Sequence, residues 1–186
     1  MDGAYIENMV KALEENGIKN TRAADRDKWS GGTVSDAFDV LSKRSRDGSK
    51  SDLSAMGTKG EQFNLIGYSY GALQASQAAL DYADNGGKVD HLVLVGAPIS
   101  KQLLEQLQKH PNIGKVEVID LDEHGDPIKA GMSTGDLVMS VPELGLDFSS
   151  GVNGEGKGHF YYGGNSPTGD SRRRKLAKTL FDLGLR

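Results

Sequence analysis

The chain has 186 residues, of which 37% are hydrophobic and 26% charged, and its formal net charge is −4. This length and composition suit one globular domain with a buried core and argue against disorder. The negative charge balance gives no reason to expect a nucleic acid partner. Because the chain has no cysteine, it excludes disulfides, thiolate metal sites and a cysteine nucleophile.

The sequence predicts neither a signal peptide nor a membrane span. Asp2 and Glu7 stand where a signal peptide has a basic start followed by an apolar block. The longest apolar stretch, Leu92 to Ile99, is too short to cross a bilayer. The compartment therefore stays open between the cytoplasm and export by a route that needs no cleaved signal.

The first third of the chain predicts helices joined by irregular segments. Tyr5 to Asn16 has apolar residues at the spacing i, i+3, i+4 and i+7, which predicts an amphipathic helix that stops at Gly17. We expect a short strand at Ile18 to Ala24 and a second helix at Thr33 to Arg44. The stretch from Asp47 to Gly60 is rich in Gly, Ser, Lys and Asp, which predicts a connecting segment.

The stretch from Gln62 to Ala75, QFNLIGYSYGALQA, predicts a strand, a tight turn and a helix. Its centre, Gly67-Tyr68-Ser69-Tyr70-Gly71, is a G-x-S-x-G motif. In that context the motif predicts a nucleophile elbow, where a strained backbone exposes the Ser69 hydroxyl. Both flanking glycines are expected because bulkier residues two positions either side of the serine would collide. The N–H of Tyr70 would then begin the helix, where developing negative charge is stabilised.

The same motif occurs a second time, at Gly131-Met132-Ser133-Thr134-Gly135. No apolar strand precedes this copy, and we see no amphipathic run of helical length after it. We therefore interpret the second copy as a flexible loop and the first as the elbow.

The remainder of the chain predicts alternating strands and helices. Val89 to Val95 is apolar on both faces, which predicts a strand covered on both sides, as in a parallel sheet. Ser100 to His110 predicts a helix, Val116 to Ile119 the next strand, and Ser171 to Leu183 a closing helix. This alternation predicts a single α/β domain with a doubly wound, mainly parallel sheet and helices on both faces.

In such sheets the functional residues lie at the carboxyl ends of the strands. One strand end is followed by Ser69 and a later one by an acidic cluster, and His159 comes further along the chain. The acids are Asp120, Asp122, Glu123 and Asp126. His124 shares a loop with them and remains an alternative base. His91 opens a strand at the opposite end of the sheet, and His110 lies in the last turn of a helix.

These features resemble the α/β-hydrolase family, in particular small bacterial lipases and esterases. The resemblance rests on residues 63–72, on the strand end Leu94 to Pro98, on Asp126-Pro127-Ile128, and on Gly158-His159 before the last helix. It implies that Ser69 is the nucleophile, His159 the general base and Asp126 the acid that orients the imidazole, with Asp122 as the alternative acid. It implies no cofactor and no metal.

The chain departs from the family at the second donor of the oxyanion hole. In the family this donor follows the first central strand and leads into the first long helix, and no strand is predicted before that helix here. By the resemblance, the donors would be the N–H groups of Tyr70 and of Gly3 or Ala4. Either the chain is a fragment, such as the C-terminal lipase-type toxin module of a longer protein, or the missing strand is supplied in another way.

We therefore expect a serine hydrolase that cleaves a carboxylic ester, a lipid acyl ester in particular, through an acyl-enzyme on Ser69. The apolar segment from Leu137 to Leu146 would act as a lid or acyl-chain wall, or alternatively as core. The run from Arg172 to Lys175 is interpreted as a solvated face at a helix start, with contact to a membrane surface or a partner as the alternative. The alternative functions are acyl transfer, thioester cleavage, and a non-catalytic binding module of hydrolase shape.

Overall fold

The structure is a computed structural model that describes residues 4–24, 40, 44, 62–142 and 156–186. The predicted helix at 33–44 and the predicted connection at 47–60 fall almost wholly outside the described residues.

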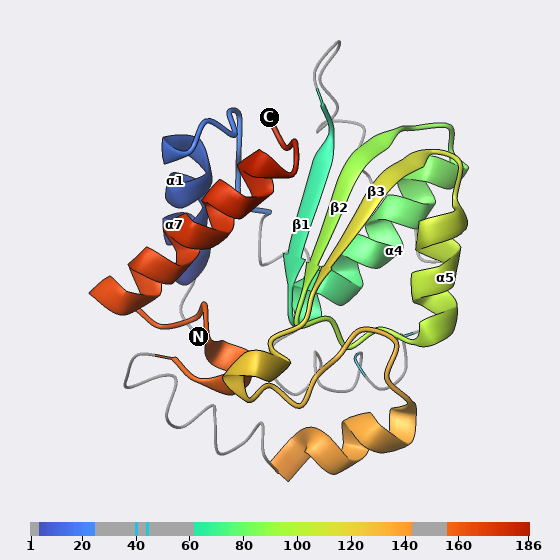
Figure 1. Cartoon of the computed structure of the whole chain (residues 1–186). Coiled ribbons are helices and arrows are strands. Elements are labelled where there is room, and N and C mark those ends of the chain that lie inside the picture. Colours follow the sequence, from blue (N-terminus) through green and yellow to red (C-terminus); the bar gives the residue numbers. More distant parts are fainter. Residues whose placement is uncertain (1–3, 25–39, 41–43, 45–61, 143–155) are drawn as a thin grey trace.

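The centre of the fold is a parallel sheet. Within the described residues its three strands, β1 (Asn64–Tyr68), β2 (Val89–Val95) and β3 (Ile113–Ile119), lie side by side in chain order (Figure 1). Tyr68 is paired with Val95, and Val95 with Ile119. The three strands therefore end together at one edge of the sheet, where the candidate site residues begin.

Helices cover both faces of this sheet, as Figure 1 shows. The crossover helices α4 (Tyr70–Asp84) and α5 (Lys101–Lys109) pack on one face, and α1 (Ala4–Glu15) and α7 (Pro167–Asp182) pack against each other on the opposite face. The predicted fold class, a parallel α/β sheet with helices on both faces, is confirmed.

The side chains of β2 explain why both faces need cover. Leu92 and Leu94 belong to the core cluster beneath α4 and α5, whereas Val93 and Val95 belong to the cluster beneath α1 and α7. All four are buried. Burying each such side chain stabilises the fold by about 1.5–3 kcal/mol relative to leaving it in water, so this strand is stable only between two helical layers.

The helix ends follow local signals in the sequence. Gly17 has φ +91° just beyond α1, and the N–H of Ile18 returns to the carbonyl of Leu13. Ser166 caps α7 by accepting the N–H of Gly169, and Pro167 is the first helical residue. The helix therefore begins four residues before the predicted start, because a serine cap followed by proline is a strong start signal.

Two local predictions are wrong. Residues 18–24 form a turn and irregular chain rather than a strand. The Thr21 hydroxyl donates to the carbonyl of Ile18 at 2.8 Å, and Asn20 has φ +56°, so local hydrogen bonding competes with an extended backbone.

The second G-x-S-x-G copy opens a helix over 134–142 instead of a flexible loop. Ser133 caps it by accepting the N–H of Asp136 at 3.1 Å, while the Asp136 carboxylate accepts the N–H and the hydroxyl of Ser133. This reciprocal arrangement is a capping box with Asp in the place of Glu.

No helix in the described part of the chain has the length and apolar character needed to cross a bilayer.

Candidate active site

Ser69 lies in the tight turn between β1 and α4 that the motif predicts. Its φ of +57° and ψ of −126° are rare for a residue with a side chain. The Ser69 N–H donates to the Val95 carbonyl at 2.9 Å, and the Ser69 carbonyl accepts the Ala72 N–H at 2.9 Å. The backbone of Ser69 is thus hydrogen-bonded to the last residue of β2 and to the first turn of α4. Ser69 as a whole residue is half-buried.

The two glycines of the motif are not equivalent. A Cβ at Gly67 would lie 2.4 Å from the Ala72 Cα, so any side chain there would force strand and helix apart. A Cβ at Gly71 would meet no described atom within 4 Å. The steric expectation therefore holds at Gly67, and within the described residues it is wrong at Gly71.

Three side chains from separate parts of the chain meet at the carboxyl edge of the sheet. Ser69 Oγ lies 2.6 Å from His159 Nε2, and His159 Nδ1 lies 2.8 Å from Asp126 Oδ2. Because Nδ1 faces a carboxylate, it carries the proton, and Nε2 accepts the hydrogen bond from the serine. The His159 side chain is 7% exposed and that of Asp126 is 0% exposed, so little water competes for these bonds.

Asp126 is held in place by its own backbone neighbour. Its Oδ1 accepts the Ile128 N–H at 2.8 Å, which leaves Oδ2 directed at the histidine. Both oxygens of the Asp126 carboxylate therefore take part in hydrogen bonds. An arrangement of this kind can draw a proton from a serine hydroxyl and stabilise the resulting imidazolium.

The other acids of the cluster do not reach His159. Asp122 is exposed and pairs with Lys129 at 3.0 Å, and the bond to this lysine lowers the pKa of the carboxyl. Asp120 accepts the Ala130 N–H at 3.0 Å, and Glu123 is exposed. Of the candidate acids, only Asp126 lies against the imidazole.

The rival histidines have other surroundings. The ring of His124 lies on that of Tyr161, with ring centroids 3.6 Å apart and planes 6° apart. His110 caps α5 and pairs with Asp84 at 3.2 Å. His91 is buried near the amino end of β2, and burial lowers its pKa.

Gly96 is a residue of the site that sequence reasoning missed. It follows β2 with φ +51°, and a Cβ there would lie 3.1 Å from Asp126 Oδ2 and 3.3 Å from His159 Cε1. Because glycine carries no side chain, the acid and the histidine can pack directly on the end of the central strand. A glycine immediately after a buried strand was the available signal.

Tyr68 was also missed, although it stands beside the nucleophile in the motif. Its hydroxyl donates to the main-chain carbonyl of His159, and the two rings stack with centroids 5.8 Å apart. Burial, assisted by the nearby Tyr5, raises the pKa of Tyr68 well above its usual value. The hydroxyl therefore keeps its proton and remains a donor.

The candidate oxyanion donors are only partly described. Tyr70 is the first residue of α4, where the helix dipole favours negative charge. Gly3 lies outside the described residues, and Ala4 is the first residue of α1. The next residue, Tyr5, packs edge-on against the Tyr68 ring at 6.0 Å. The start of α1 therefore lies beside the residue that precedes Ser69.

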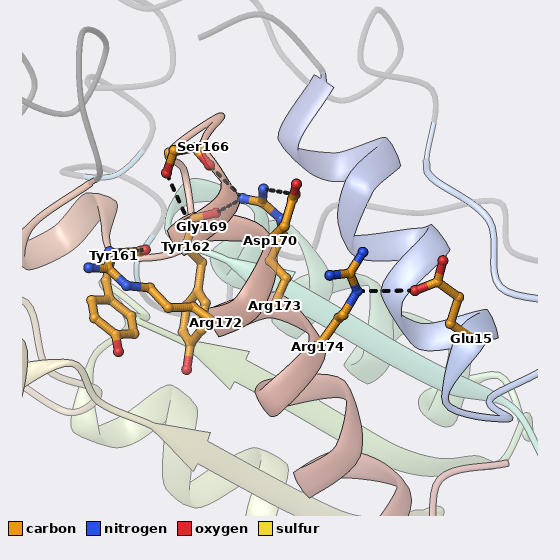
Figure 2. A network of polar contacts seen from close by, with 10 residues as sticks. Glu15, Tyr161, Tyr162, Ser166, Gly169, Asp170, Arg172, Arg173 and Arg174 are labelled. Atoms are coloured by element: carbon orange, nitrogen blue, oxygen red, sulfur yellow. Dashed lines mark hydrogen bonds and ion pairs between the residues drawn. The ribbon is translucent and has the colours of Figure 1, made fainter.

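The basic run of α7 is only in part the solvated face expected from the sequence, because Arg174 and Lys175 are exposed and the two residues before them are not. Arg173 is fully buried and Arg172 half-buried, while Arg174 pairs with Glu15 of α1 at 3.2 Å (Figure 2). The run occupies the second turn rather than the start of the helix, because α7 begins at Pro167. The expectation of a solvated face is therefore wrong for the two arginines nearest the site.

The apolar segment after the acid divides between core and surface. Within the helix over 134–142, Leu137 is buried, whereas Val138, Met139 and Val141 are 50%, 80% and 53% exposed. Residues 143–146 of the segment lie outside the described residues. Across the described chain, no group of three or more His, Asp or Glu side chains is placed to hold a metal ion.

Comparison with known families agrees with the fold. The family model of the alpha/beta hydrolase fold matches residues 57–146. The match covers just under half of the chain and supports an α/β-hydrolase fold for it. The matched range holds Ser69 and Asp126 and ends before His159, so it is the structure that brings the histidine to them. No curated protein and no solved structure matches the chain.

The match to the α/β-hydrolase fold points to hydrolysis as the general activity. The family hosts many reactions on one fold. The bond that is cleaved must therefore be argued from the site itself.

Proposed function

We propose that the protein is a serine-dependent carboxylic-ester hydrolase that acts through an acyl-enzyme on Ser69. The observation that carries the proposal is the continuous hydrogen-bonded chain from Ser69 Oγ through the His159 imidazole to Asp126. A serine hydroxyl is a poor nucleophile unless a base takes its proton during attack. Here that base lies 2.6 Å away and is oriented by a buried carboxylate.

The reaction would proceed in two halves. Ser69 Oγ attacks the ester carbonyl carbon while its proton passes to His159 Nε2, and the N–H of Tyr70 donates to the oxyanion that forms. The intermediate then expels the alcohol, which takes the proton back from Nε2 and leaves the acyl group on Ser69. A water molecule attacks this acyl-enzyme, again giving a proton to His159, and the second collapse releases the acid and restores the serine.

An apolar acyl group is favoured by the surface beside the acid loop. The helix over 134–142 follows that loop directly and exposes Val138, Met139 and Val141. Large apolar side chains that stay exposed together commonly mark a binding surface. We therefore propose a lipid acyl ester as the substrate class.

The proposal is tested with a fluorophosphonate probe, which traps an activated serine covalently. We expect labelling of the wild-type protein at Ser69, located by mass spectrometry, and no labelling of Ser69→Ala or His159→Ala. Ser133→Ala is the matched control, because Ser133 is the central serine of the second G-x-S-x-G copy and serves as a helix cap. Labelling at Ser133, or no labelling of a folded wild-type protein, would refute the proposal.

The substrate class is tested separately with p-nitrophenyl esters of increasing acyl length. We expect kcat/KM to rise from acetate to octanoate, and Met139→Gln to reduce the rate on octanoate more than on acetate. If kcat/KM is equal across the series while Ser69 is still labelled, the protein is an esterase, and the proposal of a lipid substrate is rejected.

A further inference from the structure

The segment that carries His159 has little secondary structure of its own. Within the described residues 156–166, its only regular element is the three-residue 3₁₀ helix η2 (Gly158–Phe160). A single 3₁₀ turn is too short to be stable by itself. Gly156, which precedes this turn, and Gly158, its first residue, both have positive φ, and a Cβ at Gly156 would lie 2.3 Å from the Phe160 carbonyl oxygen. Contacts from other parts of the chain must therefore fix the imidazole.

Two consecutive arginines of α7 supply such contacts through main-chain carbonyls. Arg172 Nη1 donates to the carbonyls of Gly156 at 2.8 Å and Tyr161 at 3.0 Å. Arg173 Nη1 donates to the carbonyls of Tyr162 at 2.5 Å and Gly164 at 2.9 Å, and its Nη2 donates to Asp170. Figure 2 shows both side chains directed at this segment. Together they hold carbonyls on both sides of His159.

Arg172 also takes part in a stack that reaches the acid loop. Its guanidinium carbon lies 4.0 Å from the centroid of the Tyr161 ring, and the His124 ring lies 3.6 Å from that centroid. The Arg172 guanidinium and the His124 ring are both too close to this centroid to lie on the same face of the Tyr161 ring. The Tyr161 ring therefore lies between them. His124 belongs to the 3₁₀ helix η1 (Asp122–His124), two residues before Asp126, and Tyr161 comes two residues after His159.

We propose that Arg172 is a positioning residue for His159. It clamps the histidine segment by two carbonyls and, through Tyr161 and His124, fixes that segment against the loop that carries Asp126. The planar fork of arginine can donate two hydrogen bonds and stack on a ring at once, which lysine cannot do. This inference rests on the proposed serine hydrolase activity, because it assigns a role within the same site.

The test compares the fluorophosphonate labelling rate of Arg172→Gln and Arg172→Lys with that of the wild-type protein. We expect Arg172→Gln to slow labelling by roughly 10- to 100-fold, since misplacement of a catalytic group by about 1 Å costs on the order of 100-fold. Arg172→Lys should lie between Arg172→Gln and the wild type. Arg174→Gln is the control, because Arg174 lies in the same helix but pairs with Glu15 and not with the histidine segment. It should label at the wild-type rate.

A second variant covers the case in which Arg172→Gln does not fold. His124 is exposed, and His124→Gln removes only the far side of the stack. We expect this variant to fold and to label several-fold more slowly than the wild type. A wild-type rate in folded Arg172→Gln would overturn the inference. Where that variant does not fold, a wild-type rate in His124→Gln would overturn it.

Proton NMR keeps the two proposals distinguishable. The His159 Nδ1 proton, bonded to Asp126, should give a far-downfield resonance in the wild-type protein that is lost or broadened in Arg172→Gln and retained in Arg174→Gln. If the resonance behaves in this way in all three proteins while the probe fails to label the wild type, the hydrolase proposal fails and the positioning role stands. If the wild type labels and the resonance is unchanged in Arg172→Gln, the positioning role fails and the hydrolase proposal stands.

Discussion

The two halves of the candidate site are held in different ways. Ser69 lies between a strand and a 15-residue helix, and its backbone is bonded to both β2 and α4. His159 lies in a single 3₁₀ turn, where Tyr68 binds its carbonyl, while Arg172 and Arg173 bind the carbonyls of the two residues that follow the turn. The nucleophile is thus fixed by secondary structure, whereas the base is fixed by side chains from distant parts of the chain.

This contrast predicts where the site is vulnerable. Single substitutions around the base should misplace His159 while the fold survives, because they remove side-chain contacts and leave the sheet intact. Substitutions that alter the elbow should instead disturb the packing of β1 against α4, where a Cβ at Gly67 would overlap the helix backbone.

The largest effect is expected from removing the charge that orients the base. Asp126→Asn keeps the size of the side chain but presents an amide to His159 Nδ1, which favours the wrong tautomer and withdraws support for the imidazolium. Labelling and hydrolysis should fall by about 10⁴-fold, as measured by single-turnover rates on protein whose folding is checked by circular dichroism. Asp122→Asn should leave both rates unchanged. If Asp122→Asn lost the activity and Asp126→Asn kept it, Asp122 would be the acid that orients His159.

A smaller loss is expected where the acid and the histidine pack on β2. Gly96→Ala places a methyl group 3.1 Å from Asp126 Oδ2 at a residue with φ +51°. The backbone conformation alone costs about 1–2 kcal/mol, and displacement of the pair should slow labelling by roughly 100-fold. Thermal unfolding and labelling rates measure the two effects separately. A variant with wild-type rate and stability would show that the pair does not need this close approach.

The tyrosine beside the nucleophile links the two halves directly. Tyr68→Phe keeps the ring that stacks on His159 but removes the donor to its carbonyl. We expect a loss of about 0.5–1.5 kcal/mol in unfolding free energy and a fall in rate of several-fold, with smaller consequences than Gly96→Ala. Chemical denaturation and labelling kinetics check this prediction. A fall as large as that of Asp126→Asn would mean that the tyrosine takes part in the chemistry.

The second serine motif should show stability changes without loss of activity. Ser133→Ala removes the cap of the helix over 134–142 and should cost about 0.5–2 kcal/mol, measured by thermal unfolding. Labelling at Ser69 should proceed at the wild-type rate, because Ser133 Oγ is engaged by Asp136 and lies outside the chain of bonds at His159. Loss of labelling in a folded Ser133→Ala variant would contradict this division between the two motifs.

The predictions from sequence succeeded where the pattern is local. The strand at Val89 to Val95 has the predicted bounds, because its five apolar residues, four of them consecutive at 92–95, must lie between two layers. The alternation of strands and helices likewise predicted the fold class. The prediction failed at residues 18–24 and at Ser133, where short-range side-chain hydrogen bonds decide between a turn, a strand and a helix.

The sequence by itself determined the elbow and the order of serine, acid and histidine along the chain. Only the tertiary structure decided that Asp126 rather than Asp122 lies against His159, since both follow the same strand and differ only in the direction of their side chains. It also decided that Gly96, Tyr68 and Arg172 lie at the site, because each meets the histidine segment across more than 10 residues of chain. A pattern in the sequence describes neighbours along the chain, whereas the positions of these side chains depend on how the sheet and its helices bring distant segments together.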